Sequence, residues 1–113
     1  MKIVKNKITN DELKAMAPNY FGDMVKAVAD INKVILCVGA ELHSDMEQYL
    51  LSVGSRQSDL WGFNLYPNET GDDFIEFDSM INIRPHDNNR SRDVERQEIR
   101  NKIIEIVNKK VER

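Results

Sequence analysis

Three side chains that can carry acid–base or metal chemistry lie within five residues of each other. Glu41, His43 and Asp45 alternate in the segment GAELHSD, directly after an apolar run that ends at Gly39. If the backbone is extended there, alternate side chains point to the same side, so all three project together. Two carboxylates beside an imidazole could then act in general acid–base catalysis or bind a divalent metal.

The same three residues also have a structural explanation. Ser44 and Glu47 have the spacing of a capping box, which predicts that a helix begins at this point. Asp45 would then stabilise the helix N-terminus through the macrodipole, Glu41 would cap the helix or pair with an arginine, and His43 would donate to a carboxylate. The chain has no His-x-x-x-His or Cys-x-x-Cys pattern, so we predict no bound metal and no other cofactor.

The segment Arg56-Gln57-Ser58-Asp59 follows this helix and could bind a ligand. A planar guanidinium at Arg56 could hold a carboxylate or phosphate through two hydrogen bonds, with Gln57 and Asp59 beside it. Alternatively, Arg56 is the internal counter-ion of Glu41 or Asp59. The sequence leaves both explanations open.

A second group of cations, Arg84, His86, Arg90 and Arg92, lies in and beside the polar loop HDNNRSRD, and Arg84 and Arg90 are its first candidates for ligand binding. Such a loop could hold an anion or lie over an acidic site as a lid. It could also be a solvated loop whose arginines pair with acidic residues elsewhere. Exposed ion pairs contribute only about 0–1 kcal/mol each, so stability alone is a weak reason for several cations in one loop.

Length and composition bound the class of protein. A chain of 113 residues with 41% hydrophobic and 31% charged residues predicts one domain, residues 1–113. No apolar run approaches the length of a membrane-spanning helix, and the N-terminus lacks the apolar core of a signal peptide, so we expect a cytoplasmic protein without a membrane partner. Residues 41–78 carry nine acidic groups against Arg56 alone, and general nucleic-acid binding is therefore disfavoured.

Turn signals and apolar spacing predict the elements that position these residues. Thr9 and Glu12 form a capping box that starts a helix ending at Ala17, before Pro18. The other predicted elements are a short strand in residues 1–8, helices at 19–31, 44–53 and 93–111, and strands at 34–38, 60–67 and 74–84.

Together these elements predict an α+β fold. The sheet should have three or four strands, mixed or antiparallel, and should pack against the helices at 19–31 and 93–111. The strands at 60–67 and 74–84 should form an antiparallel hairpin. Its polar face, which carries Glu76 and Asp78, could converge with the Glu41 turn and the arginine loop on one cleft. Two helices between the strand around Ile3 and the strand that begins at Val34 would make those two strands parallel.

Four motifs carry a resemblance to a known family. GAELHSD, GSRQSDLWG and SMINIRP, followed by NRSRDVE, resemble a family of small bacterial proteins classed as domain of unknown function 5674. The resemblance covers nearly the whole chain but implies no activity, since the family has none assigned. The family's motif positions, as they stand here, include Glu41, His43, Asp45, Ser55, Arg56, Gln57, Asp59, Trp61, Asn82, Arg84 and Arg90.

Two functions fit these features. The first is a binding or interaction module without catalysis, with a homodimer as one form, in which a polar cleft recognises a small anion or a partner protein. The second is a small hydrolase, such as a toxin-type ribonuclease, with His43 as acid or base, Glu41 or Asp45 as its carboxylate, and Arg56 and Arg84 stabilising charge. No complete catalytic motif is present, which favours the first. The hydrolase requires His43, Arg56 and Arg84 to reach one reacting centre.

Overall fold

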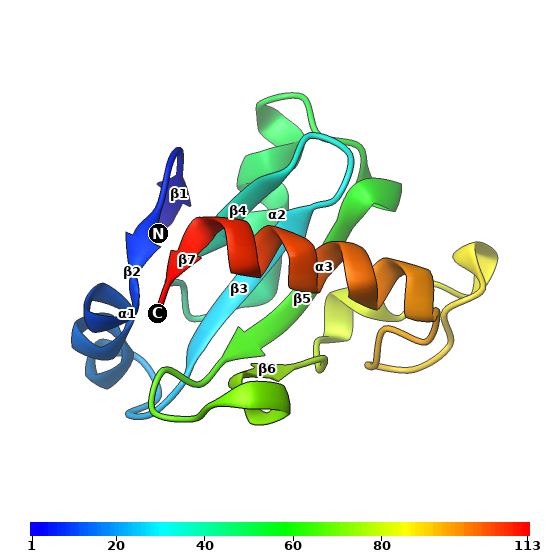
Figure 1. Ribbon diagram of the computed structural model, residues 1–113. Helices are drawn as coiled ribbons and strands as arrows, with labels where there is room; N and C mark the ends of the chain where they lie inside the picture. Colours follow the sequence, from blue (N-terminus) through cyan, green and yellow to red (C-terminus); the bar gives the residue numbers. More distant parts are fainter.

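Five antiparallel strands form the sheet that organises the fold (Figure 1). The computed structural model describes residues 1–113. Across the sheet the strands lie in the order β1 (Lys2–Val4), β4 (Ile35–Val38), β3 (Val25–Asp30), β5 (Leu60–Leu65) and β6 (Ile75–Glu76). A small parallel pair, β2 (Ile8–Thr9) with β7 (Val111–Glu112), lies apart from this sheet. The α+β class is confirmed, with five strands where three or four were predicted.

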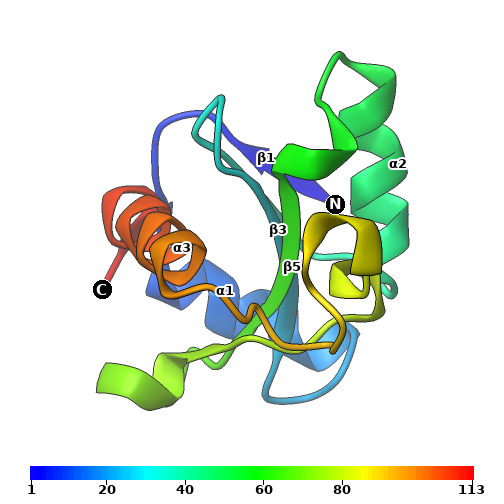
Figure 2. The ribbon, with the colours of Figure 1, turned by 90° about the vertical axis from the view of Figure 1, so that its right-hand side faces the viewer.

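Helices cover both faces of the sheet (Figure 2). The helix α3 (Gln97–Lys110) lies on one face together with α1 (Asn10–Met16), and α2 (His43–Ser52) lies on the other. The larger core fills the α3 side with 19 buried residues, including Leu36, Phe63 and Ile103. The smaller core, on the α2 side, consists of Val28, Cys37, Ala40, Met46, Leu50 and Leu60. No helix is both long and apolar enough to cross a membrane.

The predicted helix at 19–31 was wrong, because this segment contains the central strand β3. Val25, Ala27, Val28 and Ala29 are all buried, and β3 pairs with β4 on one side and β5 on the other. A strand covered on both faces is apolar at most positions and loses the period of two that marks a half-exposed strand. Since a strand replaces the helix, β1 and β4 run antiparallel rather than parallel.

The predicted strand at 74–84 is also much shorter than expected. Only Ile75–Glu76 pairs with β5, and the chain then forms short 3-10 turns at Met80–Asn82 and Pro85–Asp87. Further 3-10 turns lie at Ala17–Asn19, Gln57–Asp59 and Gly71–Phe74. The side chain of Asn82 explains the early end of the strand, because its amide takes both backbone hydrogen bonds of Gly62 that a longer β6 would use.

The helix starts were predicted with mixed success. At α1 the Thr9 side chain accepts from the Glu12 N–H at 3.1 Å as predicted, although the Glu12 carboxylate pairs with Lys2 instead. The Ser44–Glu47 capping box was wrong: α2 begins at His43 after Leu42, and no side chain caps it. The last helix buries Ile99, Ile103, Ile106 and Val107 as predicted, but it begins at Gln97.

Candidate ligand-binding cleft on the sheet

A row of three polar residues crosses the sheet on the face that α2 only partly covers. Lys26 on β3 lies opposite Asn64 on β5, and Asn64 lies opposite Glu76 on β6. Directly paired residues of neighbouring antiparallel strands share one face. On the same face, the more distant Val28 and Leu60 are apolar and pack under α2. The polar row therefore lies just beyond the N-terminal end of α2.

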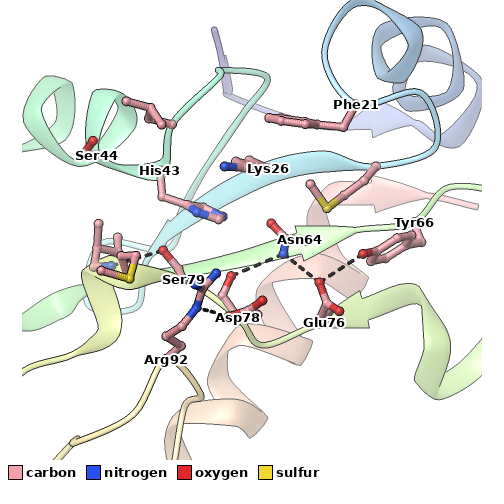
Figure 3. Close-up of a pocket in the computed structure, with 14 residues that line it drawn as sticks. Phe21, Lys26, His43, Ser44, Asn64, Tyr66, Glu76, Asp78, Ser79 and Arg92 are labelled. Atoms are coloured by element: carbon pink, nitrogen blue, oxygen red, sulfur yellow. Dashed lines mark hydrogen bonds and ion pairs between the residues drawn. The ribbon is translucent and has the colours of Figure 1, made fainter.

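The three residues of the row form the floor of a cleft (Figure 3). The cleft has a volume of about 470 Å³, within the range of small-molecule sites. Its remaining walls come from the loop before β3, the start of α2 and the segment after β5, and comprise Phe21, Met24, Leu42, His43, Ser44, Tyr66, Asp78, Ser79, Met80, Ile81 and Arg92. Ionisable side chains from five separate parts of the chain thus meet in one hollow.

Hydrogen bonds fix the amide of Asn64 in one orientation. Its Nδ2 donates to Glu76 Oε1 at 2.8 Å and to the Asp78 backbone carbonyl at 3.3 Å. The Tyr66 hydroxyl donates to the same Glu76 oxygen at 3.0 Å. Because Nδ2 faces two acceptors, Oδ1 must point the other way, toward the side of the cleft that holds Lys26 and His43 (Figure 3). Oδ1 is buried and has no donor while the His43 ring is neutral.

His43 lies at the start of α2 and is 7% exposed. Its Nε2 donates to the Phe63 carbonyl at 2.8 Å, which leaves Nδ1 as the unprotonated acceptor of the neutral ring. Burial lowers the pKa of His43, and the nearby charge of Lys26 lowers it further, while the Phe63 carbonyl and Asn64 act in the opposite direction. The imidazole is therefore neutral at pH 7.

The two cations of the cleft differ in their partners. The Arg92 Nε donates to Asp78 Oδ1 at 2.6 Å, so this guanidinium is already paired. The Lys26 ammonium makes neither an ion pair nor a hydrogen bond, and it lies over the ring of Phe21, 4.7 Å from Nζ to the centroid. An ammonium in a cleft without a counter-ion is an open position for an anionic group.

Residues 2–110 match the model of DUF5674, a protein family of unknown function. The chain belongs to this family. The resemblance predicted from the sequence motifs is thereby confirmed. No curated protein and no solved structure matches the chain.

In this DUF5674 member, the Glu41-x-His43-x-Asp45 triplet is divided between two environments. His43 points into the cleft, whereas Glu41 and Asp45 are exposed and do not line it. Asp45 diverges from His43 because side chains two residues apart on a helix do not face each other. Glu41 lies in a bend before the helix. No group of three or more His, Cys, Asp or Glu side chains is arranged to hold a metal ion.

The other predicted binding residues also lie outside the cleft of the DUF5674 fold. Arg84 is buried, and its Nη1 donates to the backbone carbonyl of Gln57, so these two predicted residues do meet. Arg56 is exposed, and Asp59 is half-buried and donates its backbone N–H to the Arg56 carbonyl. Arg90 is exposed, with its backbone N–H donating to Glu95.

Three residues of the cleft had no predicted part in a site, namely Lys26, Asn64 and Tyr66. Glu76 and Asp78 were predicted on the polar face of the hairpin, and Arg92 in the arginine loop. Lys26 could not be found in this way, since the sequence placed it on a helix. Only the pairing of β3 with β5 brings it beside Asn64.

Proposed function

We propose that this protein is a non-catalytic binding module whose cleft takes a small polar ligand through an anionic group. The observation that carries the proposal is the Lys26 ammonium, which lies on the central strand at the floor of the cleft without a counter-ion. A carboxylate or phosphate placed there would supply the counter-ion that the ammonium lacks.

Two neighbouring features support an anionic ligand group at this position. Leu42, His43 and Ser44 line the cleft at the N-terminus of α2, where no side chain caps the helix. Uncapped N–H groups and the positive end of the helix dipole favour an anion. Arg92 uses Nε for Asp78, which leaves its Nη groups for a ligand.

Binding is favoured over hydrolysis by the same geometry. A hydrolase would use a carboxylate from Glu41 or Asp45 to orient His43, and both carboxylates lie outside the cleft. Nε2 of the imidazole is engaged by the Phe63 carbonyl. Arg56 and Arg84, the cations expected to stabilise the transition state, do not line the cleft either.

The proposal is tested by thermal-shift screening of small carboxylates and phosphates, followed by calorimetry of the anions that stabilise the protein. Lys26→Met should weaken binding by about tenfold or more, the value of one charge-assisted hydrogen bond. Lys102→Met, which removes an exposed charge from α3 on the opposite face, is the matched control. Arg92→Gln gives a second test if Lys26→Met does not fold. An absence of binding by any anion, or equal weakening by the Lys102 variant, would overturn the proposal.

A further inference from the structure

A second hollow adjoins the cleft at the β6 edge of the sheet. It has a volume of about 420 Å³, and Tyr66 and Glu76 line both hollows. The rest of its lining is acidic except for one isoleucine, and comprises Asp23, Glu69, Asp72, Asp73 and Ile75. We call this second site the acidic hollow. No basic side chain lines it.

Tyr66 lies where the negative charges of the two hollows meet. Burial raises the pKa of its phenol to about 12, with further contributions from the hydrogen bond to Glu76 and from the charges of Glu76, Asp23 and Asp78. The hydroxyl therefore remains a donor to Glu76 at physiological pH. The carboxylates around it create a negative field at this end of the cleft.

The polar row sets the distance between the positive and the negative end. Lys26 and Glu76 lie two strands apart, so their backbones are separated by roughly 10 Å, twice the spacing between neighbouring strands. Between them, Asn64 is 4% exposed and its Oδ1 has no donor. The Lys26 ammonium without a counter-ion marks this row as a position for a ligand. The buried Asn64 Oδ1 beside it could accept from an α-amino or amide N–H of that ligand.

We propose that the cleft and the acidic hollow together bind one elongated zwitterion, with a carboxylate over Lys26 and a primary ammonium over Glu76 and the acidic hollow. The position of the carboxylate rests on the anion-binding function proposed above, and the position of the ammonium is the new inference. An ammonium has three donors, which suits a site with several carboxylate acceptors. The apolar walls formed by Phe21, Met24 and Met80 suit an aliphatic chain between the two charges.

An ω-amino acid of lysine length has this chemistry, and so does a lysine at the C-terminus of a peptide. The probe is 6-aminohexanoate, titrated by calorimetry into the full chain at low, fixed ionic strength. Hexanoate lacks only the ammonium, and hexylamine lacks only the carboxylate. L-lysine and the tripeptide Gly-Gly-Lys distinguish a free amino acid from a peptide end, and tight binding of either supports the proposal.

Matched variants separate the two ends of the site. We expect 6-aminohexanoate to bind about tenfold more tightly than hexanoate or hexylamine, as each lacks one charge-assisted interaction. The double variant Asp72→Asn with Asp73→Asn should weaken the binding of 6-aminohexanoate and leave the binding of hexanoate unchanged. Lys26→Met should weaken the binding of both compounds. Glu98→Gln with Glu105→Gln changes the net charge equally on exposed positions of α3 and should change neither.

The two proposals fail in different ways. If hexanoate binds in a Lys26-dependent manner and 6-aminohexanoate binds no more tightly, the zwitterion is wrong and the anion-binding function stands. The zwitterion is equally wrong if the Asp72 and Asp73 double variant binds 6-aminohexanoate like the parent. If neither hexanoate, 6-aminohexanoate nor any screened anion binds, both proposals fail.

Discussion

The guanidinium carbon of Arg84 lies 4.0 Å from the centroid of the Trp61 ring, and the two side chains are 3% and 1% exposed. Arg84 thus packs in the interior between the ring and the carbonyl of Gln57. Its Nε is 3.9 Å from Asp87 Oδ2, and neither Nε nor Nη2 has a hydrogen-bond partner. Burial lowers the pKa of Arg84, while the charges of Asp87 and Glu47 raise it. The contact stabilises the fold by packing and cation–π attraction, and the loss of hydration of the buried guanidinium opposes this stabilisation.

Arg84→Ala and Arg84→Met should therefore differ in their effect on stability. The alanine variant leaves a cavity over Trp61 and should lower the free energy of unfolding by about 2–4 kcal/mol. Methionine refills much of that volume and removes the N–H groups that lack partners, so its loss should be about 1 kcal/mol or less. Urea denaturation of the three proteins measures both values. Equal losses would mean that the charge, rather than the packing, stabilises this position.

Asn82 extends the sheet with a side chain in place of a strand. Its Oδ1 accepts from the Gly62 N–H and its Nδ2 donates to the Gly62 carbonyl, both at 2.9 Å, and Nδ2 also donates to the Arg92 carbonyl at 3.0 Å. Asn82→Asp retains the shape but turns a second oxygen toward two carbonyl groups. We expect a loss of about 2–3 kcal/mol in the free energy of unfolding at neutral pH, because a buried charged acceptor then lacks donors.

The contact between Asn82 and Gly62 can also be tested from the side of Gly62. A Cβ on this residue would lie 2.6 Å from Ser79 Oγ, so Gly62→Ala must push the Ser79 segment away from β5. Asn82→Asp and Gly62→Ala should therefore both lower the urea midpoint. Asn101→Asp, at an exposed position of α3, is the control for the chemical change alone. A stability of Asn82→Asp equal to that of the control would show that the amide pairing contributes nothing.

The elements that could be predicted from the sequence are those with a local signal. The helix α3 has apolar residues on one face and polar residues elsewhere, and β5 follows a clear turn, so both were located. The central strand β3 has no such signal, because both of its faces are buried and its apolar residues also fit a helical spacing. Only pairing with β4 and β5 decides between the two.

Only the part of the candidate site that has a local signal could be predicted from the sequence. His43 was identified because an imidazole follows a buried strand, and the structure places it in the cleft. Its sequence neighbours Glu41 and Asp45 diverge from it because the N-cap is Leu42, two residues before the Ser44 that the capping signal indicated. Lys26, Asn64 and Glu76 come together through strand pairing, which spacing along the chain does not reveal.

The turn between β3 and β4 holds a strained residue. Val34 has φ +58°, in the left-handed region that β-branched residues rarely adopt. The turn is held by Asp30, whose Oδ1 accepts from the N–H groups of Asn32 and Lys33. Asparagine tolerates this conformation better than valine, so Val34→Asn should raise the free energy of unfolding by about 0.5–1 kcal/mol.

Thermal or urea unfolding of Val34→Asn measures that gain. Val53→Asn makes the same chemical change at an exposed residue with φ −106° and should give no gain. If both variants change stability equally, the effect comes from side-chain polarity, and the backbone strain at Val34 is not released. A loss at Val34 alone would mean that the hollow that Val34 lines together with Ile31 and Ile106 favours an apolar side chain by more than the strain costs.

The stability of the protein should depend on pH through His43. Burial lowers the pKa of its imidazole below the value of about 6.5 for an unfolded chain. As the pH falls through about 6.5, the unfolded state therefore binds a proton before the native state does, and the free energy of unfolding decreases down to the lower native pKa. Above about pH 7 the imidazole is neutral in both states, and its contribution to the pH dependence of stability vanishes.

His43→Gln should remove this part of the pH dependence, and the amide N–H of the glutamine should still reach the Phe63 carbonyl. Urea midpoints at about pH 7.5 and pH 5.5 measure it. If His43→Gln loses as much stability on acidification as the parent, other groups cause the loss and the buried imidazole is not responsible.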